Sequence, residues 1–363
     1  MDITAHESLT WKYILNQLIS GQDLGSRHVD WAMDEIMTGS TPEPILASFL
    51  TSLHMKGETS EELGALARGM LAKAETIDLD VHAVDIVGTG GDQQNTVNIS
   101  TMAALVIAGT GATVVKHGNR ASTSKSGSAD VLEALGIQLD IPIKSVAACA
   151  RQVGITFLFA MTFHPSMRFV GPTRKMLGIP TAFNYLGPMT NPARVSSSAI
   201  GVANPQMVEK MAWVFANRGD HALVFRGDDG LDELTIATTS QIWEASGGTL
   251  QKYVFNPEGY GIERSSLDNL RGGDAEYNAS VFRAVLAGEG ESAKDSLHAI
   301  RNAVLINAAA GLIAYRKNDG RSFEERYTEA LADARQSIDT GAAAQVLNAW
   351  VEFSHLVVET PSP

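Results

Sequence analysis

The sequence has little of what would mark a secreted, membrane or disulfide-stabilised protein. It contains one cysteine, Cys149, which excludes an internal disulfide, and the apolar pattern around it predicts a small buried side chain. No basic segment followed by an apolar core is visible at the N-terminus, so we expect no secretory signal. The uncharged run at residues 99–115 is too short and too rich in glycine and threonine to span a bilayer. These absences predict a cytoplasmic protein with no membrane partner.

Basic residues are also scarce. There are 28 Lys and Arg against 41 Asp and Glu, a formal net charge of −13. A nucleic-acid-binding protein needs a basic groove, so this balance argues against nucleic acid as a partner. It argues equally against the alternative that the chain is a non-catalytic paralogue of an enzyme that binds nucleic acid. A polyanionic substrate would instead need cations placed locally, by a basic loop or a metal. With 363 residues and 44% hydrophobic content, the chain can form one large domain and a smaller one.

The most informative stretch is residues 85–130. A short apolar strand at residues 84–87 runs into Gly88-Thr89-Gly90-Gly91-Asp92. Glycines at this spacing let backbone N–H groups approach a ligand and permit positive φ, as phosphate-binding loops require. The segment lacks the G-K-[ST] ending of a Walker loop and the full G-x-G-x-x-G pattern, and a glycine turn alone is common structural punctuation. Hydroxyl and amide residues then precede a helix expected from Met102, where an anion is favoured.

A second loop of similar character follows. The strand at residues 113–115 ends in Lys116-His117-Gly118-Asn119-Arg120, and a run of hydroxyl residues leads into a helix expected at residues 129–135. Two successive strand–loop–helix units aim their loops at the same edge of a parallel sheet. Two polar loops with three basic groups in an acidic chain therefore predict a phosphate-rich ligand.

The remaining pattern predicts two structural regions. Residues 1–75 have apolar residues at helical spacing in four short segments, which predicts a helical domain. From residue 82, strands alternate with helices, which predicts a mostly parallel sheet covered on both faces. The proline-rich segment 164–195 interrupts this alternation, and residues 246–272 suggest a β-rich excursion. The strands are expected at 84–87, 113–115, 155–160, 197–202, 222–225 and 242–245, and the closing helices at 273–288, 294–316, 323–338 and 342–354.

Several ordered motifs resemble one known family. DIVGTGGD and TVNIST in the first loop, with KHGNR and SGSADVLEALG in the second, are similar to the anthranilate phosphoribosyltransferases. The resemblance continues through His164-Pro165, through Arg174-Lys175 with FNYLGPMTNP at residues 183–192, and through GDDGLDE at residues 227–233. It covers nearly the whole chain.

The resemblance implies a fold, a reaction and an assembly. The fold would be α/β, with a small N-terminal helical domain and a large α/β domain around a mostly parallel sheet, like that of nucleoside phosphorylases. The helical domain would span residues 1–78, joined by about 170–195, and the domain that binds phosphoribosyl pyrophosphate would span 79–169 and 196–363. The enzyme would join the amino group of anthranilate to the phosphoribosyl group, releasing pyrophosphate, in tryptophan biosynthesis. It would be a homodimer formed through the helical domain.

The resemblance also assigns site residues. It implies Mg²⁺, two ions per subunit, held by Ser100, Asp232 and Glu233; carboxylates with substrate phosphates are the ligands Mg²⁺ prefers, although an exposed acidic turn is the alternative for that pair. Anthranilate would contact Gly88, Asn119 and Arg174, whose guanidinium suits a carboxylate. No covalent catalytic residue is implied, because positioning and charge stabilisation suffice. Phosphoribosyl pyrophosphate would contact Gly88, Gly91, Asp92, Thr96, Asn98, Ile99, Ser100, Thr101, Lys116, His117, Gly118, Asn119, Arg120, Ala121, Ser122, Thr123, Ser124 and Ser128.

Two departures from the family pattern and one rival remain. Many members have glycine where this chain has Gln93, so a positive φ there would force the loop to adapt. Many also have arginine where this chain has Pro180, so no arginine role carries over at that position. The rival is a pyrimidine nucleoside phosphorylase, which shares the architecture but binds inorganic phosphate and has no need of the Asp232-Glu233 pair.

Overall fold

The computed structural model describes residues 9–121, 125–290, 295–316 and 318–359, and these form two compact units. The first unit comprises residues 1–76 and 161–190, and the second comprises residues 77–160 and 191–363. The second chain segment of the first unit thus begins earlier than the expected residue 170 and ends before 195. Predicted Ser122, Thr123 and Ser124 lie outside the described residues.

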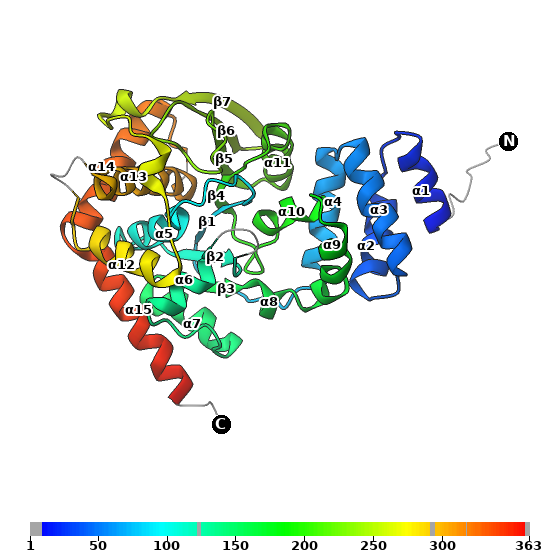
Figure 1. The fold of residues 1–363 in the computed structure, drawn as a ribbon, viewed down its shortest axis with the longest axis horizontal. Helices are drawn as coiled ribbons and strands as arrows, with labels where there is room; N and C mark the ends of the chain where they lie inside the picture. Colours follow the sequence, from blue (N-terminus) through cyan, green and yellow to red (C-terminus); the bar gives the residue numbers. More distant parts are fainter. Residues whose placement is uncertain (1–8, 122–124, 291–294, 317, 360–363) are drawn as a thin grey trace. The chain divides into compact units, whose positions relative to one another are not determined.

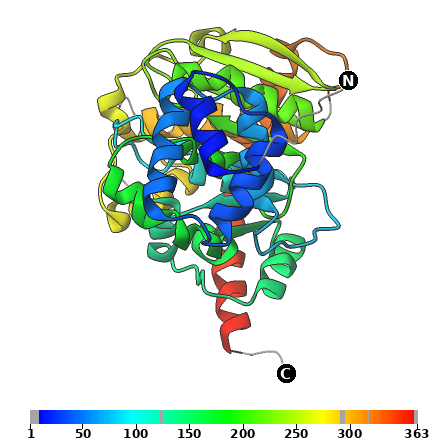
Figure 2. The ribbon, with the colours of Figure 1, turned by 90° about the vertical axis from the view of Figure 1, so that its right-hand side faces the viewer.

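The first unit is a helical bundle (Figures 1 and 2). Thr10 caps its first helix through a bond to the Tyr13 N–H, and Thr59 and Glu62 form a capping box at the fourth, so each helix start satisfies otherwise unpaired amide groups. Ile14, Met33 and Phe49 are fully buried in its core. Its helices are α1 (Trp11–Ile19), α2 (Ser26–Met37), α3 (Glu43–Lys56), α4 (Ser60–Leu71), α9 (Gly171–Leu177) and α10 (Phe183–Leu186), with the 3₁₀ helices η1 (Pro165–Phe169) and η2 (Gly187–Met189).

The second unit is built on a sheet of seven strands within the described residues, in the order β3-β2-β1-β4-β5-β6-β7. Strands β1 to β5 pair in parallel, and β6 and β7 add an antiparallel edge (Figure 1). The carboxyl ends of β1, β2 and β4 therefore meet at one edge of the sheet, where both predicted loops begin. The strands are β1 (Val84–Gly88), β2 (Val114–Gly118), β3 (Ile155–Phe159), β4 (Ser197–Gly201), β5 (His221–Gly227), β6 (Ser240–Ser246) and β7 (Thr249–Phe255).

Helices pack on this sheet and enclose one large apolar core. Helix α13 is its centre: among the described residues it is the one helix long and apolar enough to cross a membrane, but 89% of its apolar window is buried inside the protein. A Cβ atom at Gly311 would lie 2.3 Å from Ile107 Cδ1, so glycine lets α13 approach α5 closely. The helices are α5 (Ile99–Gly109), α6 (Ser128–Ala134), α7 (Ile143–Val153), α8 (Ala160–Phe163, at the boundary between units), α11 (Pro205–Arg218), α12 (Ala275–Leu286), α13 (Ser296–Tyr315), α14 (Phe323–Asp339) and α15 (Ala342–Glu359), with η3 (Pro257–Tyr260) and η4 (Leu267–Leu270).

The predicted fold class is confirmed, with two corrections in detail. Helix α5 begins at Ile99 rather than Met102, because Ile99 is an apolar residue buried in its first turn. Ser100 and Thr101 therefore belong to the helix and do not precede it. The segment 246–272 is not β-rich beyond β7, since the rest forms short 3₁₀ turns capped by Asn256 and Ser266.

Candidate functional site

The glycine-rich loop after β1 folds against the acidic segment after β5. The backbone N–H of Gly90 donates to Asp232 Oδ2 at 2.7 Å. A Cβ at Gly88 would lie 2.2 Å from the same oxygen, and a Cβ at Gly201, the last residue of β4, would lie 1.7 Å from the Asp232 carbonyl oxygen. Glycine is therefore required at both strand ends for Asp232 to come so close. Gly91, with φ +87°, then carries the loop outward to Asp92.

Three carboxyl groups gather at this point: Asp92, Asp232 and Glu233. Burial and the neighbouring Asp92 raise the pKa of Asp232 to about 7. Burial and the neighbouring Asp232 raise the pKa of Glu233 well above its ordinary value. Burial likewise raises the pKa of Asp92, whose side chain interacts with that of Asp232. Like charges held this close in a buried position repel one another.

This donor set fits a hard divalent cation. Among the described residues, no three His, Cys, Asp or Glu side chains converge as a ready-made metal cage. Asp232 and Glu233 are each less than a tenth exposed, and the backbone N–H of Ser100, in the first turn of α5, favours the charged form of Glu233. Mg²⁺ is commonly held by one or two carboxylates with water and substrate phosphates completing the shell. An incomplete protein shell and the raised pKa values of Asp232 and Glu233 both agree with that mode of binding.

Lys116 supplies a positive charge beneath the loop. It is 1% exposed, and its ammonium group donates to the Ile86 carbonyl and lies 3.3 Å from Ser100 Oγ. Burial lowers its pKa, and the charges of Asp85, Glu233 and Asp232 oppose that shift. Lys116 is therefore an internal counter-charge to the acidic cluster and not a surface lysine at the end of a strand.

Asp85 is the carboxylate on the other side of Lys116. It is fully buried, which raises its pKa to about 6. Its Oδ1 accepts the His117 backbone N–H at 3.2 Å, and its Oδ2 accepts the Asn191 side-chain amide at 2.8 Å. Asp85 thus joins β1 to the end of β2, where the second loop starts.

The second loop is closed at its base by Asp130, on α6. Its Oδ2 accepts the backbone N–H groups of Ala121 at 2.9 Å and Gly127 at 2.8 Å. A Cβ at Gly127 would lie 2.3 Å from the Ala121 nitrogen, so the two ends of the loop nearly touch. The Arg120 guanidinium pairs with Asp130 at 3.0 Å and with Glu133 at 2.5 Å. Of the expected basic trio, Lys116 and His117 are therefore buried in β2 and Arg120 is neutralised by acidic partners.

The structure brings most of the predicted contacts for phosphoribosyl pyrophosphate together at one edge of the sheet of the second unit. Thr101 Oγ1 donates to Ser128 Oγ at 3.1 Å, which links α5 to α6. The Asn119 side chain accepts the Arg120 N–H at 2.8 Å, and a Cβ at Gly118 would lie 2.8 Å from the Phe157 ring. Thr96 forms an isolated β-bridge with Arg271, from the segment before α12.

Arg174 belongs to the first unit. Its guanidinium donates to Asn184 Oδ1 at 3.3 Å and lies over the Phe183 ring at 5.9 Å from the ring centre. Both partners come from the predicted motif at residues 183–192. Pro180 precedes Thr181, whose backbone N–H also bonds the Asn184 side chain at 3.0 Å.

Sequence reasoning missed several residues that shape this site. Gly201 carried a usable signal, because a glycine at the end of a predicted strand often marks close backbone approach. Asp85 and Asn191 lie inside recognised motifs, but their partners are distant in the sequence, whereas Asp130 accepts from the nearby Gly127 and Ala121. Asn278, on α12, carried no signal at all. Gln93 was noted as a departure, and it does adopt φ +60°.

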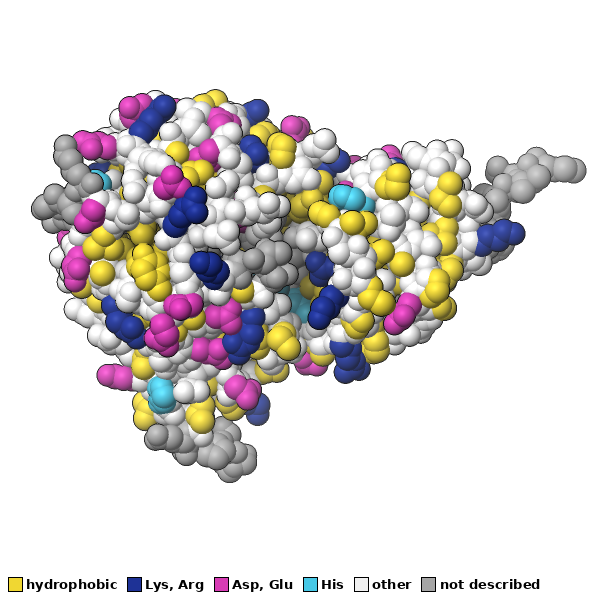
Figure 3. Space-filling view, in the orientation of Figure 1, with side chains coloured by type: hydrophobic (Ala, Val, Ile, Leu, Met, Phe, Trp, Pro, Cys, Tyr) yellow, Lys and Arg dark blue, Asp and Glu magenta, His cyan; other side chains and the backbone are white. Residues whose placement is uncertain are grey.

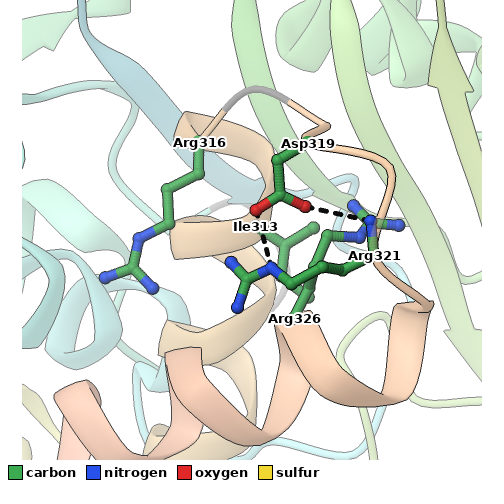
Figure 4. Close-up of a pocket in the computed structure, with 5 residues that line it drawn as sticks. All are labelled: Ile313, Arg316, Asp319, Arg321 and Arg326. Carbon is green, nitrogen blue, oxygen red and sulfur yellow. Dashed lines mark hydrogen bonds and ion pairs between the residues drawn. The ribbon is translucent and has the colours of Figure 1, made fainter.

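A pocket of about 200 Å³ lies elsewhere in the second unit, between α13 and α14 (Figure 4). It is lined by Ile313, Arg316, Asp319, Arg321 and Arg326, none of which is a predicted site residue. Its arginines are paired with carboxylates, as Figure 4 shows for Arg321 and Asp319. On the protein face shown in Figure 3, basic and acidic side chains are likewise interspersed.

Comparison with known proteins agrees with this geometry. Residues 80–344 match the model of the glycosyl transferase family, a/b domain, and residues 12–74 match that of the glycosyl transferase family, helical bundle domain. An anthranilate phosphoribosyltransferase of Arthrobacter sp. (strain FB24) is 53% identical over 345 residues, which is 95% of this chain and 96% of the relative.

Solved structures of anthranilate phosphoribosyltransferases have the same fold as this chain. That from Thermus thermophilus has a TM-score of 0.85 at 37% identity, covering 94% of this chain and 99% of that one. The Saccharomyces cerevisiae protein in complex with PRPP and Mg has a TM-score of 0.85 at 28% identity, covering 96% and 99%. The same yeast protein in complex with 4-fluoroanthranilate has a TM-score of 0.84 at 26% identity, covering 97% and 99%.

Proposed function

This chain belongs to the anthranilate phosphoribosyltransferase family, and from that premise we propose that it transfers the phosphoribosyl group of phosphoribosyl pyrophosphate to the amino group of anthranilate. The products are N-(5-phosphoribosyl)anthranilate and pyrophosphate, and the reaction serves tryptophan biosynthesis. The observation that carries the proposal is the closure of the glycine-rich loop on Asp232, beside buried carboxylates and Lys116. Such a site suits a polyanion bound together with a metal ion.

The protein acts by positioning and by charge. Phosphoribosyl pyrophosphate lies along the two loops, where backbone N–H groups and hydroxyls face its phosphates and Lys116 adds positive charge from beneath the first loop. Asp232, Glu233 and Ser100 hold Mg²⁺, two ions per subunit, and bound Mg²⁺ neutralises charge on the departing pyrophosphate. Anthranilate, whose aromatic amine is already unprotonated at neutral pH, needs no strong base. It is held at Gly88 and Asn119, and Arg174 binds its carboxylate.

The assembly and location follow from the same premise. The protein forms a homodimer through its helical unit and acts in the cytoplasm. Ile19, Met55 and Met176 of that unit are 74%, 83% and 68% exposed, so they are available for such a contact. Sedimentation of the purified protein at several concentrations tests the dimer: a monomer across the whole range would contradict it.

Anthranilate fluorescence tests the reaction. The fluorescence should fall with time only when the protein, phosphoribosyl pyrophosphate and Mg²⁺ are all present. A matched arm replaces phosphoribosyl pyrophosphate with a pyrimidine nucleoside and inorganic phosphate. Consumption of the nucleoside, with anthranilate untouched, would assign the protein to the rival phosphorylase reaction.

A further inference from the structure

Three hydrogen bonds connect helix α12 to both loops of the site. The Gly273 backbone N–H donates to Asn278 Oδ1 at 2.9 Å. Asn278 Nδ2 donates to Asn98 Oδ1 at 2.9 Å, and Asn98 Nδ2 donates to the Ser126 carbonyl at 3.0 Å. Asn98 ends the first loop and Ser126 belongs to the second. Two side-chain amides in series therefore span from α12 across the first loop to the second.

The direction of this chain of bonds is fixed at both ends. A backbone N–H only donates, so the atom of Asn278 that faces Gly273 must be its oxygen. A backbone carbonyl only accepts, so the atom of Asn98 that faces Ser126 must be its nitrogen. Between these ends the Asn278 nitrogen meets the Asn98 oxygen. No other orientation of the two amides satisfies all three bonds.

The backbone beside this chain is equally constrained. The Val97 N–H donates to the Leu270 carbonyl at 2.9 Å, and the Gly272 N–H donates to the Asn95 carbonyl at 2.8 Å. A Cβ at Gly272 would lie 2.7 Å from the Thr96 carbonyl oxygen. Asn278 itself is 1% exposed, so a lost bond there is not replaced by water. Hydrogen bonds from residues 270–278 thus fix the end of the first loop in place.

We propose that Asn278 is a positioning residue for the phosphoribosyl pyrophosphate site, acting through the amide of Asn98. It sets which way the Asn98 amide faces and so fixes the first loop against the Ser126 carbonyl of the second. The inference rests on the proposed function, because it assigns Asn278 to the site of that substrate. None of the proposed anthranilate contacts (Gly88, Asn119 and Arg174) is a member of this chain of bonds, so the effect should fall on phosphoribosyl pyrophosphate.

The test is the near-isosteric variant Asn278→Asp. At pH 8 one oxygen of the introduced carboxylate can still accept the Gly273 N–H. Its other oxygen replaces the Asn278 nitrogen, so two acceptor oxygens face each other at Asn98. Either the hydrogen bond to Asn98 is lost, or the Asn98 amide rotates to keep it. Rotation places the Asn98 oxygen against the Ser126 carbonyl oxygen, and the bond to Ser126 is lost instead. Leaving one buried polar group unpaired predicts a KM for phosphoribosyl pyrophosphate raised about 5- to 150-fold, with the KM for anthranilate unchanged.

Acid should rescue the variant. When the introduced carboxyl is protonated, its O–H donates to the Asn98 oxygen and restores the original direction of the bonds. The ratio of variant to wild-type KM for phosphoribosyl pyrophosphate, measured at each pH from 8 to 5.5, should fall toward one. If Asn278 only stabilised α12, the ratio of the two KM values would not fall toward one in acid.

Asp274→Ala is the matched control. Asp274 caps α12 by accepting the Tyr277 N–H at 2.9 Å, so its loss weakens the same helix without touching the amide chain. It should lower the melting temperature and leave both KM values alone. An Asn278→Asp protein with unchanged KM values, with both KM values raised equally, or with no recovery in acid would overturn the proposal.

Calorimetry separates this inference from the proposed reaction. Phosphoribosyl pyrophosphate is titrated with Mg²⁺ into the wild type and both variants, with no anthranilate present. A wild type that binds the compound but consumes no anthranilate would overturn the reaction, and the ratio of affinities would still decide the role of Asn278. A wild type that neither binds nor reacts would overturn both.

Discussion

The Oδ2 atom of Asp232 accepts a 2.7 Å hydrogen bond from the backbone N–H of Gly90, a residue 142 positions earlier in the chain. One carboxylate therefore holds the glycine-rich loop in place and adds charge to the site. Glu233, the next residue, approaches the start of α5. The acidic pair is thus part of the loop's structure as well as a candidate metal ligand.

Removing one charge from this cluster should stabilise the metal-free protein and abolish its activity. In Glu233→Gln, the cost of burying this carboxylate and its repulsion with Asp232 both disappear, so the free energy of unfolding should rise by about 0.5–2 kcal/mol. Phosphoribosyl pyrophosphate with Mg²⁺ should raise the melting temperature of the wild type but not of the variant. Asp228→Asn, an exposed acid in the same turn, should keep both turnover and the ligand response. Full activity of Glu233→Gln in EDTA would contradict a metal role.

Arg174 is the proposed anchor of the anthranilate carboxylate. Arg174→Ala should raise the KM for anthranilate about 10- to 150-fold, from the loss of roughly 1.5–3 kcal/mol of charged hydrogen bonding, with little change in the KM for phosphoribosyl pyrophosphate. Arg168→Ala, which removes a guanidinium lying over Phe169 in the same unit, is the control and should change neither KM. Equal increases for both substrates would indicate a structural role for Arg174 instead.

Gln93 is held at φ +60°, in the left-handed region that side chains rarely adopt. Gln93→Gly should relieve this strain and raise the free energy of unfolding by up to about 1 kcal/mol, measured by urea unfolding. Gln94→Gly, at a neighbour that is not in the left-handed region, should lower it by about 0.5–1 kcal/mol. The strain idea would be wrong if both substitutions moved stability in the same direction.

A buried ion pair should govern acid stability. Glu244 is 1% exposed and accepts two 2.8 Å bonds from the Arg326 guanidinium, which together with His221 lower its pKa to about 2 despite burial. Since the ordinary pKa of 4.5 is higher, this stability is fully present above pH 4.5 and is lost as pH falls from there toward 2. Urea midpoints measured between pH 7 and pH 2.5 should therefore decline in the wild type.

Glu244→Gln is the matching variant. It breaks a buried pair and should cost about 3–5 kcal/mol at pH 7, and it should lack the part of the acid decline that Glu244 causes. Glu329→Gln removes an exposed partner of Arg321 and should cost about 1 kcal/mol or less. Identical acid profiles for wild type and Glu244→Gln would exclude Glu244 as the cause.

Much of the fold and the position of the site could be predicted because their signals are local. Glycine spacing after β1, hydroxyls at the start of α5 and an acidic pair after β5 are all visible within short windows, and parallel strands bring their ends together. The burial of Lys116 could not be predicted this way. The segment that contains it reads as a strand running into a polar loop, and only packing against β1 and the acidic segment encloses its ammonium group.

Asn278 shows the same limit more sharply. An asparagine in the first turn of a helix has no distinguishing local pattern, and its role depends on an amide 180 positions away. The positive φ of Gln93 is intermediate: the sequence showed that glycine was missing, but not whether the loop would keep the strained conformation or avoid it. Asn278 and Asp85 were therefore missed because their partners are distant in the sequence.

The separation of Asn98 and Asn278 along the sequence also has a consequence for synthesis of the protein. The 180 residues between them take about 9–36 s to translate at about 5–20 residues per second. During that interval a nascent chain already carries the glycine-rich loop but not the helix that holds it. Any chain released before α12 would expose the loop without its support. On the ribosome, the nascent chain should therefore become able to bind its substrate only late in synthesis, well after the first strands of the sheet have been made.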